Sequence, residues 1–190
     1  MLNLGTFILQ RETMQKNIPN LTTKNLTLRP LTMDDLDAMF RLFSEPDMLK
    51  YFPNPNPPTM DRAQKMIETQ IQQWEKYGLG SWGVVPHGET ELAGWNGLQY
   101  LPETNETEVG YMLSRKFWGK GYSTEGARAG VEFGFKNLGL EAIIGLVHPE
   151  NVASQRVLLK CGMIFTYQAN YFGMEMFRYQ ITREEFFTSV

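Results

Sequence analysis

The chain has 190 residues, of which 42% are hydrophobic and 21% are charged. This length suits one domain with a sizeable core and is short for two, and the composition excludes a disordered or fibrous chain. The formal net charge of −3 supplies no positive field for nucleic acid or for an anionic membrane surface, so polyanionic partners are excluded.

The cysteine content and the N-terminal segment indicate the compartment in which the protein is expected. The single cysteine, Cys161, excludes an intramolecular disulfide and a zinc site built on cysteine pairs, and it fits a reducing cytoplasm. The apolar stretch over 5–9 is too short for a membrane span or a secretory signal. Residues 1–24 show no clear period, so we expect an N-terminal extension that docks on the domain, residues 25–190, or on a second copy in a homodimer.

The first half of the domain predicts a strand followed by two helices. Apolar and polar residues alternate before Pro30, as in a strand that ends at a proline. Thr32 and Thr59 are suitable N-caps, and apolar residues recur behind each at helical spacing. The predicted elements are a strand over 26–29, a helix over about 36–43 and, after a proline-rich loop, a helix over about 59–74.

The second half predicts strands first and then alternating helices and strands. Three strand-like runs separated by turns indicate an antiparallel meander. The expected elements are strands over 82–85, 92–98 and 109–113, a helix over 123–138, a strand over 142–147, a helix over 152–161, and strands over 164–169 and 174–181. This order fits one α/β (α+β) domain with helices on the faces of a single sheet.

A glycine-punctuated turn joins the strand over 109–113 to the following helix. It carries Gly119 and Gly121, which admit positive φ angles and close approach of a ligand, and Lys116 and Lys120 add positive charge. A strand that leads into such a turn directs unpaired amides and the positive end of a helix toward one point, where anions bind. The stretch lacks the Lys-Ser or Lys-Thr of a P-loop and the third glycine of a dinucleotide fingerprint. By itself it predicts either an anion site or an ordinary strand-to-helix turn.

A second motif follows the strand over 142–147. Asn151 has the character of an N-cap, Ser154 lies in the first turn of the helix, and Gly162 ends it. Capping alone also explains either residue.

Together the two motifs resemble the GNAT acetyltransferase superfamily, and the run from Trp118 to Tyr122 with Asn151 and Ser154 is most similar to its ribosomal-protein alanine/serine N-acetyltransferase branch. The resemblance covers residues 25–183. It implies a mixed, mostly antiparallel, twisted sheet with helices on both faces, and acetyl-CoA as co-substrate without a metal. It also implies that the strand before the glycine turn splays from its neighbour and binds the pantetheine arm, while turn amides bind the pyrophosphate. The implied cofactor-binding residues are Val109, Tyr111, Met112, Leu113, Trp118, Gly119, Lys120, Gly121, Tyr122, Ser123 and Asn151.

The sequence departs from the family pattern at two positions. Lys116 stands where arginine or glutamine is usual, which matters little because backbone amides carry that contact. Leu158 stands where many members have a tyrosine that protonates the leaving thiolate. We therefore assign that catalytic role to Ser154 or to a water that it orients.

Acetyl transfer also needs a base, because a primary ammonium is mostly protonated near neutral pH. The first candidate is Glu108, at the start of the splayed strand, and Glu106 points the same way by alternation. Both residues are also consistent with solvated acids at a loop end. The resemblance places the developing oxyanion near the backbone N–H of Met112 or Leu113. Cys161, without a paired histidine, is expected to be core packing.

We therefore predict transfer of an acetyl group from acetyl-CoA to a primary amine by direct attack in a ternary complex. The acceptor is either a protein N-terminal amine or a small-molecule amine, and His148, at a strand end, is a candidate to face it. An alternative of another class is a non-catalytic acetyl-CoA-binding or regulatory module, which would bind the carrier without turnover.

Overall fold

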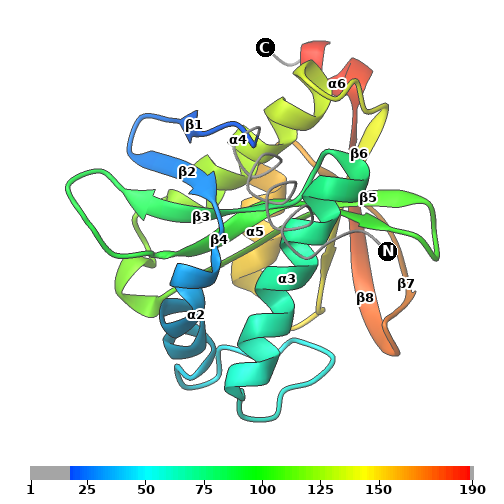
Figure 1. Cartoon of the computed structure of the whole chain (residues 1–190). Helices are drawn as coiled ribbons and strands as arrows, with labels where there is room; N and C mark the ends of the chain where they lie inside the picture. The colour runs from blue at the N-terminus through cyan, green and yellow to red at the C-terminus, as the bar shows by residue number, and fades with distance from the viewer. Residues whose placement is uncertain (1–17, 189–190) are drawn as a thin grey trace, which may run out of the picture.

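A computed structural model describes residues 18–188, which form one eight-stranded sheet with helices on both faces (Figure 1). The strands are β1 (Leu21–Thr22), β2 (Leu26–Pro30), β3 (Ser81–Pro86), β4 (Gly94–Leu101), β5 (Glu106–Leu113), β6 (Ala142–Val147), β7 (Ile164–Tyr171) and β8 (Met174–Thr182). The helices are α2 (Leu36–Phe43), α3 (Met60–Tyr77), α4 (Tyr122–Lys136), α5 (Val152–Lys160) and α6 (Arg183–Thr188), with short 3₁₀ turns at Met33–Asp35 and Arg115–Phe117. In this part of the chain, no helix has the length and apolar character needed to span a bilayer.

The sheet has the order β1-β2-β3-β4-β5-β6-β8-β7 and is antiparallel except between β5 and β6. The predicted fold class and the predicted order of elements are confirmed. The sequence did not predict α6, which follows β8. Residues 1–17 of the expected N-terminal extension lie outside the described residues.

Two helix layers cover the sheet, α2 and α3 on one face and α4 and α5 on the other (Figure 1). Successive side chains of a strand point to opposite faces, and β5 shows the consequence. Val109 packs with Val131 of α4, whereas Met112 packs with Met39 of α2 and Ile67 of α3. Strand β5 therefore carries one set of side chains toward each helix layer.

Helix α4 packs closely on the sheet because glycines of the helix face the sheet. A Cβ on Gly134 would lie 2.7 Å from Ile143 Cδ1, and one on Gly126 would lie 3.3 Å from Cγ of the buried Asn96. Larger side chains at these positions would push the helix outward. The glycines thus set the position of α4, and with it the position of its N-terminus.

The first turn of α4 is also tied to the segment before β2. The carboxylate of Glu125 accepts hydrogen bonds from Thr23 Oγ1 at 2.6 Å, from Asn25 N at 2.6 Å and from Asn25 Nδ2 at 2.8 Å. The indole of Trp82 donates to Pro19 O at 2.8 Å. Part of the expected extension, including the two residues of β1, is therefore joined to the sheet and to α4.

Candidate active site

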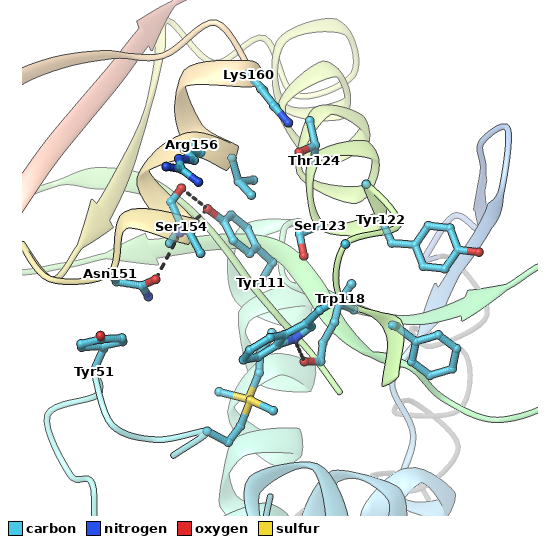
Figure 2. Close-up of a pocket in the computed structure, with 18 of the residues that line it drawn as sticks. Tyr51, Tyr111, Trp118, Tyr122, Ser123, Thr124, Asn151, Ser154, Arg156 and Lys160 are labelled. Atoms are coloured by element: carbon cyan, nitrogen blue, oxygen red, sulfur yellow. Dashed lines mark hydrogen bonds between the residues drawn. The ribbon is translucent and has the colours of Figure 1, made fainter. Parts of the chain in front are cut away.

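The site lies where β5 and β6 separate. In the described structure these parallel strands share one paired position, Glu108 with Ile144. Beyond it β5 continues with β4 as far as Leu113, whereas β6 continues with β8 as far as Val147. The strands therefore diverge, as the family resemblance implies, and a cleft of about 520 Å³ opens between them (Figure 2).

Most of the residues expected to bind the cofactor line this cleft, together with Ser154. Those that do so are Tyr111, Met112, Leu113, Trp118, Gly119, Gly121, Tyr122, Ser123 and Asn151. Two of the expected residues do not line it. Val109 is 2% exposed and belongs to the core under α4, because it directly follows Glu108, the last position at which β5 is paired with β6. The ammonium of Lys120 lies 5.3 Å from the centre of the Phe117 ring, directed over that ring.

The glycine turn presents open amides to the cleft. Gly119 has a φ of 76° and Gly121, the N-cap of α4, a φ of 82°. The first intrahelical bond runs from Glu125 N to Gly121 O at 3.0 Å, so the N–H groups of residues 122–124 have no acceptor within the helix. A Cβ on either glycine would meet no described atom within 4 Å. The space in front of the turn is therefore available to an anion.

The set of open amides differs by one residue at each end from the expected set. The N–H of Trp118 donates to Arg115 O at 3.0 Å, so it is already used within the turn. Its indole instead lines the cleft and donates to Leu113 O at 2.7 Å. At the other end, Thr124 lines the cleft in the first turn of α4. The set of residues that the family resemblance implies ended at Ser123, so Thr124 was missed.

Helix α5 forms the wall opposite α4. The side chain of Asn151 caps it by accepting from Ser154 N at 3.1 Å. The hydroxyl oxygens of Ser154 and Tyr111 lie 2.8 Å apart, and the Tyr111 hydroxyl also donates to Ser154 O at 3.1 Å (Figure 2). Leu158 is 1% exposed and packs in the core, so the position that departs from the family pattern contributes no group to the cleft.

Besides Phe117, two groups of lining residues were not named individually by sequence reasoning. The loop between α2 and α3 supplies Asp47, Met48, Tyr51 and Phe52, and helix α5 supplies Ala153, Arg156, Val157 and Lys160. For the first group, the proline-rich loop that starts at Phe52 was expected to be either a pocket wall or a rigid connector between two helices. Arg156 and Lys160 are four residues apart and so lie on one face of α5, where positive charge suits a phosphate-bearing ligand.

The α2–α3 loop is joined to the end of β6 beside the cleft. The rings of Tyr51 and His148 stack with centroids 5.1 Å apart, and the Tyr51 hydroxyl donates to Glu150 O at 3.4 Å. His148 is thus in contact with the loop that lines the cleft but does not line the cleft itself.

The two candidate bases on β5 have different surroundings. Glu106 accepts from Arg178 Nη2 at 2.7 Å and from the Tyr171 hydroxyl at 3.1 Å. Burial acts to raise the pKa of Glu106, but these hydrogen bonds, with the Arg178 charge, hold it below its usual range. Glu106 is therefore a permanently ionised partner of the buried Arg178.

Glu108 lies two residues further along β5 on the same face, at the point where the strands begin to part. Burial of its carboxyl raises its pKa to about 7, the negative charge of Glu106 adds to the rise, and a hydrogen bond from the Leu146 amide opposes it. It does not line the cleft itself. A carboxyl that titrates near neutrality has the character of a general base.

Cys161 has no nucleophilic character here. Burial raises the pKa of its thiol to about 12, and its sulfur lies 3.8 Å from Thr124 O. Over residues 18–188, no group of three or more histidine, cysteine or acidic side chains is arranged to hold a metal ion.

A sheet that opens over a glycine-initiated helix, with basic residues beside the opening, defines an acyltransferase that takes its acyl group from a phosphate-bearing carrier. The chain belongs to the GNAT acetyltransferase family, since the model of that acetyltransferase domain matches residues 25–164. It is 34% identical over 191 residues to the FsC-acetyl coenzyme A-N(2)-transacetylase of Aspergillus fumigatus, over 88% of this chain and 77% of that protein. It is thus an acyltransferase of a family that uses acetyl-CoA.

Solved structures agree with this assignment. An acetyltransferase from Agrobacterium tumefaciens superposes with a TM-score of 0.78 at 27% identity, over 87% of this chain and 95% of that one. A proposed ribosomal-protein-serine acetyltransferase from Vibrio cholerae superposes with a TM-score of 0.71 at 22% identity, over 86% and 97% of the two chains. At that identity the likeness shows the fold alone. The superfamily is therefore confirmed, whereas the ribosomal-protein branch stays a prediction.

Proposed function

We propose that the protein transfers the acetyl group of acetyl-CoA directly to a primary amine, with Glu108 as the general base. The observation that carries the proposal is the place of Glu108, a carboxyl with a pKa of about 7 at the point where β5 and β6 part. The chemistry needs a group there that accepts a proton near neutral pH.

The carrier is proposed to enter along the α4 and α5 side of the cleft. Its pyrophosphate would lie on the open amides from Gly119 to Thr124, where the positive end of the α4 dipole adds attraction. Arg156 and Lys160 lie on the same side and suit its phosphates. The pantetheine arm would then run along the unpaired edge of β5 beyond Val109, with Asn151 beside it.

The acceptor is proposed to approach from the α2 and α3 face, on which Glu108 lies. Glu108 takes a proton from the ammonium, directly or through a water, and the neutral amine attacks the thioester carbonyl. The oxyanion is stabilised by the backbone N–H of Met112 or Leu113, and the carbon–sulfur bond then breaks. The products are the acetylated amine and the free thiol of CoA, with one proton released to solvent.

A nitrogen acceptor is supported by the N(2)-transacetylase name of the Aspergillus fumigatus relative. The acceptor is either a small molecule or a protein N-terminus, and the second is the one that the resemblance to the ribosomal-protein branch supports. A non-catalytic carrier-binding module would have no use for a desolvated carboxyl at this point, so Glu108 favours the enzyme.

A thiol-release assay with acetyl-CoA, run against mixed small amines and peptides, tests the proposal. The variant Glu108→Gln should lower turnover by about 10²- to 10⁴-fold and leave acetyl-CoA binding unchanged. The matched control is Glu103→Gln, which changes an exposed acid in the β4–β5 turn and should have no effect. An unchanged rate in Glu108→Gln would reject Glu108 as the base, and binding without release for any amine would favour the non-catalytic module.

A further inference from the structure

A pair of hydroxyl groups joins the two sides of the cleft. Tyr111 comes from β5 and Ser154 from the first turn of α5, and their oxygens are 2.8 Å apart. Tyr111 Oη also lies 3.1 Å from Ser154 O, so the phenol is within hydrogen-bond distance of two oxygens of the same residue. Figure 2 shows the phenol of Tyr111 directed at Ser154.

The phenol of Tyr111 keeps its proton, because burial raises its pKa well above the ordinary value. A carbonyl oxygen only accepts, so the phenol is the donor toward Ser154 O, whereas between the two hydroxyls either oxygen can be the donor. When the phenol donates to the Ser154 hydroxyl oxygen as well, the Ser154 hydrogen is left for a ligand in the cleft.

The reaction creates a charge that needs such a donor. When the amine displaces the thioester sulfur, the electron pair of the carbon–sulfur bond goes to sulfur and a thiolate forms. A hydrogen bond to an ionised acceptor is about twice as strong as a neutral one, so a hydroxyl aimed at the sulfur stabilises the departing group.

We infer that Tyr111 is a positioning residue which holds the Ser154 hydroxyl as the hydrogen-bond donor to the departing thiolate. The inference rests on the proposed function. In this step the nitrogen–carbon bond forms, the carbon–sulfur bond breaks, and Ser154 donates a hydrogen bond without losing its proton. The amine nitrogen loses two protons over the reaction, one to Glu108 before the attack and one after it. The thiolate takes up one proton from solvent, so the net release is one proton. Because a hydrogen bond received by an O–H group strengthens the one it donates, Tyr111 increases the effect of Ser154.

The other tyrosines of the cleft are not placed for this role. The Tyr51 hydroxyl is bonded to Glu150 O, and its ring is stacked on His148. Tyr122 points away from Ser154 in Figure 2. Leu158, where the family often has a tyrosine, is buried and apolar.

The test is steady-state kinetics of Tyr111→Phe with acetyl-CoA and with its selenoester analogue, whose selenolate is a better leaving group. We expect kcat with acetyl-CoA to fall about 10-fold, an unchanged KM for acetyl-CoA, and a smaller loss with the selenoester. Ser154→Ala should lower kcat at least as much, and adding Tyr111→Phe to it should change nothing more, because Tyr111 acts through Ser154. Tyr100→Phe is the control, since it removes a hydroxyl bonded to Asn105 at 2.7 Å outside the cleft.

Three results would overturn the inference: an unchanged kcat in Tyr111→Phe, an equal loss with both esters, or a further loss in the Ser154→Ala background. If Tyr111→Phe does not fold, fluorotyrosine at position 111 keeps the ring and the hydroxyl. Since its phenol is a stronger hydrogen-bond donor, kcat with acetyl-CoA should change more than kcat with the selenoester, and an equal effect on both esters would reject the role. A wild type that releases no thiol overturns the proposed function together with this inference, whereas an active wild type with normal variants overturns the inference alone.

Discussion

Replacing Gly121 by alanine tests whether the glycine turn binds the carrier. With a φ of 82°, the added Cβ meets no described atom within 4 Å, so its structural cost is the left-handed backbone alone. That cost is about 1–2 kcal/mol, which for a chain of this size lowers Tm by about 2–8 °C. Gly88, in the turn between β3 and β4, has a φ of 84° and equally open surroundings. Gly88→Ala therefore carries the same strain away from the cleft.

The two variants should differ only in their response to acetyl-CoA, measured as a thermal shift. At about 100 times its Kd the ligand stabilises the wild type and Gly88→Ala by about 2.7 kcal/mol. If the Cβ of Gly121→Ala displaces the pyrophosphate from two amides, each worth about 1.5 kcal/mol, affinity falls about 100-fold. The same ligand concentration then stabilises that variant by only about 0.4 kcal/mol. Equal shifts in the two variants would refute the assignment of the turn as the phosphate site.

Two further substitutions test the electrostatics of the site and the anchoring of α4. Glu106→Gln removes a negative charge that raises the pKa of Glu108. Because the base must be ionised, the fall of kcat/KM on the acidic side of the pH profile should move to a pH below about 7, the wild-type pKa of Glu108. An acidic side that does not move would contradict the coupling of the two carboxylates. Glu125→Gln weakens the hydrogen bonds to the Glu125 carboxylate. These bonds outweigh the effect of burial and hold the pKa of Glu125 below its usual range. The carboxylate therefore stabilises the fold fully above the unfolded-state pKa of about 4.3, and this contribution is lost as the pH falls through the lower pKa of the folded state. We expect this variant to lose about 1 kcal/mol at pH 7 and progressively less toward pH 3, measured by denaturant unfolding, and a loss independent of pH would contradict the role of the charge.

The fold could be predicted because its signals are local. Apolar periodicity located the strands and helices, and Gly119 and Gly121 located the start of α4 to within one residue. The α2–α3 loop could not be placed over the cleft in this way. Its contact with the end of β6 depends on the stacking of Tyr51 on His148, which are far apart in the sequence and share no local pattern.

The same limit explains why the two acids of β5 could not be separated from sequence. Alternation puts Glu106 and Glu108 on one face, which holds in the structure. Their difference comes from Arg178 on β8 and Tyr171 on β7, which donate hydrogen bonds to Glu106 and keep it ionised. Tertiary contacts with β7 and β8 therefore decide which of the two acids has a pKa near 7.

The packing of α5 on the sheet explains why a phenol near the leaving group comes from β5. A Cβ on Gly145 of β6 would lie 2.6 Å from Leu158 Cδ2, so the absence of a side chain at Gly145 lets Leu158 fill the space between α5 and the sheet. Ser154 lies one turn earlier on the same side of α5, nearer the N-terminus of the helix, where it lines the cleft. A group that reaches Ser154 from the sheet must then come from the strand that borders the opening, and Tyr111 has that place on β5. The core packing of Leu158 and the hydroxyl pair at Ser154 are thus two results of one helix orientation.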